Sequence, residues 1–164
     1  MGIRVQGIHH IGISVPDSAR AREFFVDLLG AVVEVPPISW RDNPFLDAIV
    51  GLSGSAADQF MCRLGNANIE VFEYHAPRSE PQDPNEGVNT YGYTHFALQV
   101  EDIAACYQRL VEAGIRVHTP PDLSGIVTHA DGSKSGWTCT YCRDFFGNVF
   151  EIMEIHENDQ MKRI

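Results

Sequence analysis

A single internal duplication constrains the fold of this 164-residue chain more than any other feature. The stretch GIHHIGISVPD, residues 7–17, corresponds position by position to GYTHFALQVED, residues 92–102. His10 then falls on His95, and Val15 falls on Val100. One duplication of this kind predicts two similar structural units rather than a solenoid array.

A helix is expected after each of these stretches. Asp17 and Asp102 are residues that cap helix N-termini, and Gly30 and Gly114 favour the left-handed conformation that ends a helix. Between these signals, apolar residues recur with the spacing of one buried helix face. The first set is Ala21, Phe24, Phe25, Leu28 and Leu29, and the second is Ile103, Cys106, Tyr107, Leu110 and Val111.

Both halves end in a similar way, with a turn followed by a strand. The sequences are LGNANIEVFEY in the first half and FGNVFEIMEI in the second, and Gly65-Asn66 and Gly147-Asn148 favour hairpin turns. Each half therefore reads strand, helix and three strands, an α+β pattern of two tandem βαβββ modules. One helix-covered face per sheet leaves two free faces that can close on each other.

The expected layout is a single domain over residues 1–164, in four parts. Residues 5–75 form the first module, 76–91 a linker, 92–156 the second module and 157–164 a tail. Within the first module, Pro, Gly and Ser interrupt every period over residues 36–59, so a mobile loop or lid is as consistent with this segment as regular structure.

Strand alternation places one histidine and one glutamate of each half on the face turned away from the helix. His10 alternates with Ile11 and Ile13, and His95 with Phe96 and Leu98. In the closing strands, Glu70 lies between Ile69 and Val71, and Glu151 lies between Phe150 and Ile152. Gly12, Ser14, Ala97 and Gln99 share this face.

Two imidazoles and two carboxylates on buried faces predict a divalent metal, because isolated buried charges are costly unless they are paired or bound to a cation. The donor set suits Zn, Ni, Co, Mn or Fe(II). Each residue taken alone is more often hydrogen-bonded or on the surface. The repetition of both residue types in the same order favours the metal site.

The formal charge of −10 disfavours nucleic acid and anionic membranes as partners. No apolar run is long enough for a membrane span and no signal sequence is recognisable, so a cytoplasmic location is expected. The four cysteines do not form a disulfide framework, and Cys139 and Cys142 lack the second pair that a four-sulfur zinc site needs. They are expected to be packing residues or plain thiols.

The motifs HHIGISV, FFVDLLG, GNANIEVFEY, THFALQV and RDFFGNVFEIMEI resemble the vicinal oxygen chelate superfamily. Its members include glyoxalase I, methylmalonyl-CoA epimerase, extradiol dioxygenases and bleomycin or fosfomycin resistance proteins. The resemblance implies a cupped, barrel-like mixed sheet with helices on the outer face, around one divalent metal and a substrate that chelates it through neighbouring oxygens. The ligands carried over by position are His10, Glu70, His95 and Glu151, and a homodimer is expected.

Within this superfamily, a carboxylate at Glu70 resembles glyoxalase I, whereas HHIGISV is similar to the epimerase. The implied function is a divalent-metal-dependent lyase or isomerase that moves a proton next to a metal-chelated carbonyl of a small substrate. Glu151 is the first candidate base and Glu70 the second. The alternatives are an iron dioxygenase using His10, His95 and Glu151, and a binding or resistance protein without turnover.

Substrate specificity is expected to come from two loop regions, around residues 36–45 and 120–137. Trp40, Arg41 and Trp137 are the candidate substrate contacts there. Gln99 and Ser14, on the same face as the histidines, are candidates for orienting the substrate.

Overall fold

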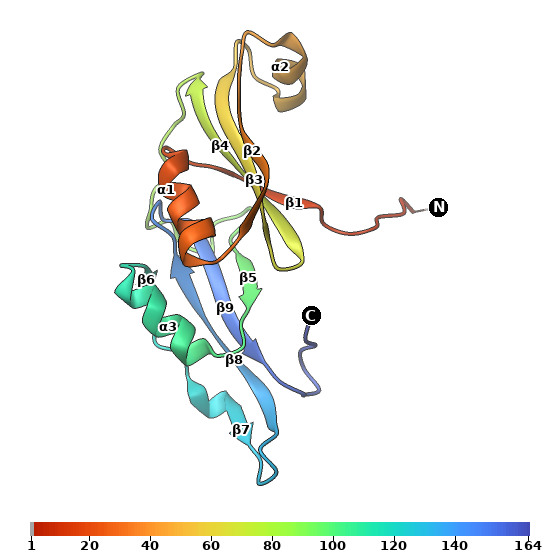
Figure 1. The fold of residues 1–164 in the computed structure, drawn as a ribbon, viewed down its shortest axis with the longest axis vertical. Helices are drawn as coiled ribbons and strands as arrows, with labels where there is room; N and C mark the ends of the chain where they lie inside the picture. The colour runs from red at the N-terminus through yellow and green to blue at the C-terminus, as the bar shows by residue number, and fades with distance from the viewer. Residues whose placement is uncertain (1) are drawn as a thin grey trace. The chain divides into compact units, whose positions relative to one another are not determined.

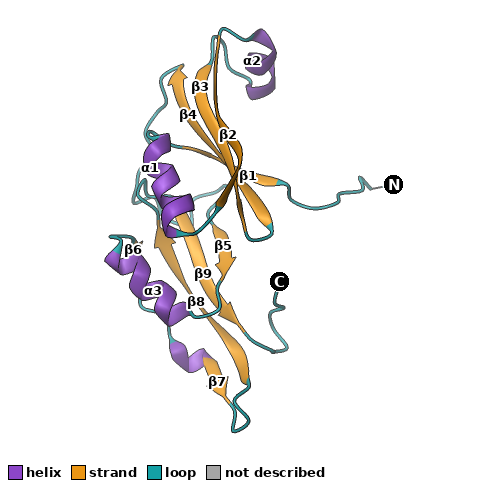
Figure 2. Ribbon diagram, viewed as in Figure 1, coloured by secondary structure: helices purple, strands orange, loops and turns teal. Residues whose placement is uncertain are grey.

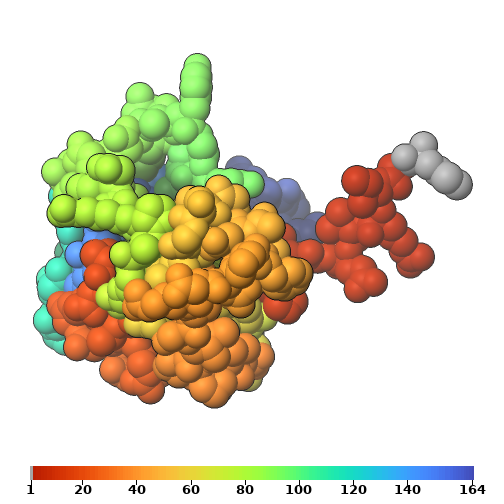
Figure 3. Space-filling model, turned by 90° about the horizontal axis from the view of Figure 1, so that it is seen from above, coloured from red at the N-terminus to blue at the C-terminus, as the bar shows by residue number. Residues whose placement is uncertain are grey.

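The structure is a computed structural model, and it describes residues 2–164. The chain divides between Pro81 and Gln82 into two compact units, each with its own sheet (Figures 1 and 2). Residues 2–9, which precede the first strand, are exposed and extend away from the first unit (Figure 3). The expected division into two modules and a linker stays a prediction.

The first unit has a four-stranded mixed sheet in the order β1-β4-β3-β2. Its elements are β1 (His10–Ser14), α1 (Ser18–Arg22), the π-helical turn η1 (Glu23–Leu28), β2 (Val32–Arg41), α2 (Pro44–Val50), β3 (Ala56–Leu64) and β4 (Ala67–Ala76). The first and last strands, β1 and β4, pair in parallel, and the other pairs are antiparallel. The α1–η1 helix covers one face of this sheet (Figure 1).

The second unit repeats this topology. Its elements are β5 (Phe96–Gln99), α3 (Ile103–Glu112), β6 (Arg116–Val117), the 3-10 turn η2 (Leu123–Gly125), β7 (Ile126–Thr128), β8 (Lys134–Arg143) and β9 (Val149–Ile155). The order is β5-β9-β8-β6, with β5 parallel to β9 and the short β7 paired to β8. The predicted α+β class with mixed sheets is confirmed. Within residues 2–164, the helices lack the length and apolar character that crossing a bilayer requires.

The helices bury the predicted apolar faces against the sheets. In the first unit Ala21, Phe24 and Phe25 are at most 1% exposed, and they belong to a core that also contains Phe60 and Val71. In the second unit Ile103 and Leu110 are buried, as are Cys142, Phe150 and Ile152 of the sheet. The inclusion of Val111 in the buried face is wrong, because this residue, at the end of the stripe, is 45% exposed.

Two carboxylates bind the backbone amides at the start of each helix: the predicted aspartate and a glutamate of the last strand. Asp17 accepts a hydrogen bond from Arg20 N at 2.9 Å, and Asp102 accepts one from Ala105 N at 2.9 Å. The carboxylate of Glu73 accepts from Ser18 N at 2.8 Å, and Glu154 accepts from Ile103 N at 2.9 Å. The last strand of each unit therefore also satisfies free amides at the helix start.

The segment over residues 36–59 is regular, not a loop. Strand β2 continues through Pro36 and Pro37 because it is the edge strand, where a missing amide donor is tolerated, and its register shifts between Val35 and Ile38. Helix α2 then begins after Asn43, whose side chain accepts from two backbone amides. It ends at Gly51, which has a φ of 70°.

The two Gly-Asn pairs lie in turns, as predicted. Gly65-Asn66 connects β3 directly to β4, and Gly65 has a φ of 60°. Gly147-Asn148 ends a longer loop before β9, in which Asp144 accepts hydrogen bonds from Phe146 N and Asn148 N. These turns set the register of the last hairpin in each unit.

We expect Glu154→Gln to reduce stability and to change its pH dependence. Burial opposes the charge of Glu154, but hydrogen bonds from Ile103 N, His156 and Lys134 outweigh it and hold the pKa below the ordinary value of 4.5. A lowered folded-state pKa stabilises the protein above pH 4.5, and this contribution is lost as the pH falls through the folded-state value. Urea unfolding at several pH values should show a loss of about 1–3 kcal/mol at pH 7 that shrinks in acid.

The matched control is Glu157→Gln, because Glu157 is an exposed carboxylate close by in the sequence. It should leave both stability and its pH dependence almost unchanged. The same dependence of unfolding free energy on pH in the wild type and in Glu154→Gln would contradict the proposed role of the Glu154 carboxylate.

Candidate functional site

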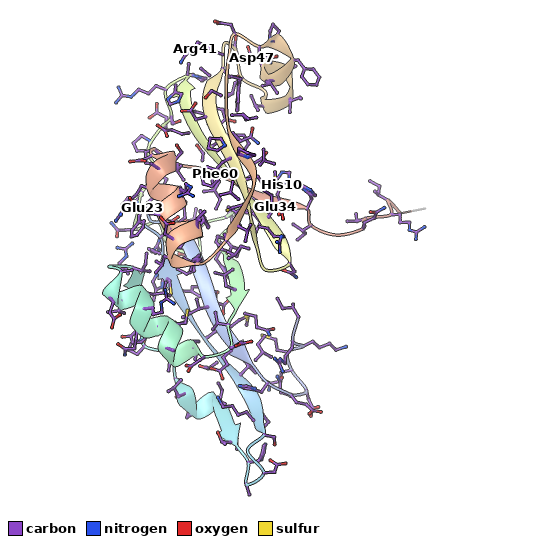
Figure 4. The ribbon with its side chains drawn as sticks, viewed as in Figure 1. His10, Glu23, Glu34, Arg41, Asp47 and Phe60 are labelled. Carbon is purple, nitrogen blue, oxygen red and sulfur yellow. The ribbon has the colours of Figure 1, made fainter. Side chains whose placement is uncertain are left out.

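The first unit brings one histidine and one glutamate together on the face away from the helix. The parallel register of β1 and β4 places Gly12 opposite Glu70 and His10 opposite Asn68. His10 Nε2 lies 3.2 Å from Glu70 Oε2, and the Glu70 side chain is 15% exposed. His10 lies at the start of β1 (Figure 4).

The second unit forms the same pair in the same register. Ala97, two residues after His95, lies opposite Glu151 in the parallel pairing of β5 and β9. His95 Nε2 lies 3.3 Å from Glu151 Oε2, and the Glu151 side chain is 12% exposed. Sequence alternation therefore predicted correctly which histidine and glutamate share a face in each half.

The strand next to each glutamate supplies a hydrogen-bond donor to it. Gln59 of β3 donates from its amide to Glu70. At the corresponding position of β8, Cys139 hydrogen-bonds to Glu151, and burial, this hydrogen bond and the Glu151 charge raise the pKa of Cys139 to about 12. The two pairs thus match in their histidine and carboxylate but differ in their supports, an amide in one unit and a thiol in the other.

The surroundings of the second pair are also aromatic and basic. The rings of His95 and Tyr141 have centroids 4.5 Å apart, and Tyr141 lies opposite Glu151 in the sheet. Tyr141 also contacts His118, whose ring accepts a hydrogen bond from Arg143 Nε at 3.2 Å. Burial and the charges of Arg143 and Arg116 lower the pKa of His118, so it is a neutral acceptor at pH 7.

The donor chemistry of each pair fits a divalent metal. Imidazole nitrogen and carboxylate oxygen are ligands that Zn, Ni, Co, Mn and Fe(II) share. Opposite His10 in the sheet, the buried Asn68 Oδ1 has no hydrogen-bond partner within the described part of the chain, so it is an available hydrogen-bond acceptor. No group of three or more His, Cys, Asp and Glu side chains assembles among residues 2–164, so each pair supplies two donors.

The predicted substrate contacts of the first unit lie on different faces. Trp40 contacts aromatic rings of β4 on the face of Glu70. Arg41, the next residue, alternates to the other face and lies at the α2 end of the unit, away from His10 (Figure 4). There a hydrogen bond from Ser39, another from His75 and the Arg41 charge hold the pKa of Asp58 below its ordinary value. The structure does not bring Arg41 to the face of the pair.

In the second unit, both predicted contacts share the face of Glu151 and bind residues of the tail. Trp137 lies two residues before Cys139 on β8, on the same face, and donates from Nε1 to Gln160 Oε1 at 2.9 Å. Gln99 lies two residues after Ala97 on β5, on the same face, and accepts a hydrogen bond from Ile164 N at 3.0 Å. The roles of all four residues in substrate binding stay predictions.

Sequence reasoning missed the residues that support the glutamates, chiefly Gln59 and Cys139. A signal for one of them was present: a two-residue turn at Gly65-Asn66 pairs Met61 with Glu70, which places Gln59 diagonally beside that carboxylate. The longer loop before β9 removed the same signal for Cys139.

Comparison with known proteins supports the fold and the family. The family model described as the glyoxalase/bleomycin resistance protein/dioxygenase superfamily matches residues 9–134. The chain belongs to this superfamily. An Actinomyces protein named 2-epi-5-epi-valiolone epimerase is 28% identical over 151 residues, which cover 90% of this chain and 79% of that relative.

Two solved structures of superfamily proteins show the same fold. A glyoxalase family protein from Bacillus cereus has a TM-score of 0.76 at 20% identity, covering 94% of this chain and 97% of its own. The fosfomycin resistance protein FosX from Listeria monocytogenes, solved with Mn(II) and sulfate, has a TM-score of 0.54 at 17% identity, covering 92% and 93%. A superfamily member of this fold therefore binds a divalent metal.

Metal-free protein provides a test of the contact between Cys139 and Glu151. Because thiolate is the reactive form, the raised pKa of Cys139 should make this half-buried thiol react slowly with Ellman's reagent at pH 8. Glu151→Gln removes the negative charge that contributes to the shift, so the reaction should become about three- to tenfold faster.

Glu70→Gln, the corresponding change in the first unit, is the control and should leave the rate unchanged. Adding Cys139→Ser to Glu151→Gln should abolish the gain. A rate that does not respond to Glu151→Gln would show that the carboxylate and the thiol are not in contact.

Proposed function

We propose that the protein is a divalent-metal-dependent isomerase of the epimerase type, which moves a proton at a carbon next to a chelated carbonyl group. The observation that carries this proposal is the duplicated pair, His10 with Glu70 and His95 with Glu151, at 3.2 and 3.3 Å. We propose that one His10–Glu70 pair and one His95–Glu151 pair together bind one metal ion. The two pairs belong either to one chain or to two chains of a dimer. Its substrate is a small molecule with neighbouring oxygens.

The choice of isomerase over lyase is supported by the Actinomyces relative, which is named as an epimerase. Epimerisation next to a carbonyl needs only proton transfer, with no bond to sulfur or oxygen made or broken. A carboxylate base, a metal and water therefore supply all the groups that the reaction uses.

Glu151 is the better candidate for the base. Its hydrogen-bond partner is the thiol of Cys139, a weak donor, whereas the amide of Gln59 holds Glu70. A weakly held carboxylate is freer to turn toward a substrate C–H. Glu151 takes the proton, the electron pair of the C–H bond moves toward the carbonyl oxygen, and water returns a proton to the other face of the carbon. Glu151 then releases its proton to water, which restores the starting state.

A bound divalent metal supplies positive charge that stabilises the oxygen anion formed when the proton leaves. The chain itself positions the ligands and limits access of water. The Glu151 side chain is only 12% exposed, and Tyr141 packs on His95, which restricts the orientation of the imidazole. A homodimer and a cytoplasmic location remain predictions.

The metal assignment predicts that His95→Ala weakens metal binding by about tenfold or more, because it removes a ligand. Elemental analysis after reconstitution with Mn(II), Zn(II), Ni(II), Co(II) or Fe(II) and desalting measures this. The matched control is His75→Ala, which breaks another His–carboxylate pair, His75 Nε2 to Asp58 Oδ2 at 2.9 Å, on the opposite face. Undiminished metal in His95→Ala would refute the ligand assignment.

The reaction itself is tested by isotope exchange. A true substrate incubated in deuterated water with metal should gain deuterium at the carbon next to the carbonyl, and Glu151→Gln should slow this by about two to four orders of magnitude. The panel contains 2-epi-5-epi-valiolone, 2-oxoaldehyde thiol adducts and 2-substituted malonyl thioesters. Consumption of oxygen with a catechol, lost in Glu151→Ala and retained in Glu70→Gln, would instead indicate the dioxygenase alternative.

A further inference from the structure

Three aromatic side chains stand together on the face of the first sheet that carries His10 and Glu70. Phe72 and Tyr74 follow Glu70 at alternate positions of β4, and their rings stack with centroids 5.7 Å apart and planes 19° apart. The Trp40 ring from β2 meets both of them edge-on, with centroids at 6.1 and 6.0 Å. All three are partly exposed. We name this set, Trp40, Phe72 and Tyr74, the aromatic shelf.

A chain of hydrogen bonds fixes the orientation of Trp40. Its indole Nε1 donates to Ser55 Oγ at 2.9 Å, and Ser55 Oγ donates to Asp47 Oδ1 at 2.5 Å. Asp47 also accepts from Ser55 N and Gly54 N, and Ser55 is fully buried. The polar edge of the indole is therefore satisfied inside the unit, which leaves the ring faces for apolar contact.

The shelf begins directly beside the His10–Glu70 pair. A Cβ at Gly12, the residue opposite Glu70 in β1, would meet the Phe72 ring at 3.8 Å, so the ring lies along the strand that carries His10. Burial and the negative charge of Glu70 raise the pKa of Tyr74, so the carboxylate acts on this ring as well. A molecule bound at the pair would thus extend over the shelf.

The second unit does not repeat this feature. In the matching registers of β4 and β9, Phe72 corresponds to Met153 and Tyr74 to Ile155. The shared fold therefore does not require aromatic rings at these positions. A feature present in one of two equivalent units is a candidate for substrate specificity, whereas the repeated His–Glu pair serves both units.

We infer that the aromatic shelf binds the C–H face of a saturated ring, so that the substrate is a hydroxylated cyclic ketone whose neighbouring oxygens reach the His10–Glu70 pair. The face of an aromatic ring is electron-rich, and ring C–H groups next to oxygen-bearing carbons are electron-poor. A rigid ring also loses less conformational freedom on binding than an open chain does. This inference rests on the proposed function, which supplies the ketone and its neighbouring oxygens.

Tryptophan fluorescence gives a direct test. The chain has two tryptophans, so Trp137→Phe leaves Trp40 as the single emitter, within the shelf. The probes are 2-hydroxycyclohexanone and 4-hydroxyhexan-3-one, which have equal numbers of carbons and the same neighbouring oxygens but differ in the ring. With Mn(II) present, the cyclic probe should change Trp40 emission and bind about three- to tenfold more tightly.

Matched variants then show which residues cause the tighter binding of the cyclic probe. Phe72→Leu should remove most of it, while Phe45→Leu, the same substitution at a residue of α2 that is 72% exposed, should leave it intact. Ser55→Ala should shift Trp40 emission and reduce the preference, and Ser55→Thr, which keeps the hydroxyl, should restore both. Circular dichroism and unfolding curves show that each variant is folded.

The outcomes separate this inference from the proposed function. Equal affinity for the two probes, no binding of either up to its solubility limit, or an unchanged preference in Phe72→Leu would overturn the shelf as a ring site. Deuterium exchange dependent on Glu151 would still support the isomerase in that case. Conversely, a ring preference that depends on Phe72 in a protein that retains no metal would keep the shelf and refute the metal-dependent reaction.

Discussion

The parallel pairing of the first and last strands in each unit is the constraint on which the rest of the structure depends. It places Gly12 opposite Glu70 and Ala97 opposite Glu151, so that His10 and His95 each lie beside a carboxylate. A shift of either register by one residue would send the glutamate to the helix side. Fold and site are therefore specified by the same hydrogen-bonded ladder.

That ladder also explains why each last strand carries two glutamates spaced three residues apart. With a period of two, Glu70 and Glu73 point to opposite faces, as do Glu151 and Glu154. One carboxylate joins the histidine, and the other accepts hydrogen bonds from the first amides of the helix. One strand thus holds the helix on one face and presents the carboxylate of the His–Glu pair on the other.

The two units agree in scaffold and differ in what surrounds the pair. The amide of Gln59 supports Glu70, and the thiol of Cys139 supports Glu151. Beyond the pairs, the first unit has an aromatic surface and the second has Tyr141 beside His118. A shared fold accommodates many functions through changes in such neighbouring side chains, and the proposed choice of substrate and base rests on this asymmetry.

The sequence by itself determined the two βαβββ units, the aspartate caps, the Gly-Asn turns and the shared face of each histidine and glutamate. These features follow from residue preferences and periods within a few residues, which are local properties of the chain. It did not determine the strand that continues through Pro36 and Pro37, the exposure of Val111, or the contacts of Gln59 and Cys139 with the glutamates. Those depend on which strand lies at an edge and which residues meet across strands, and such long-range pairing exists only once the tertiary structure forms.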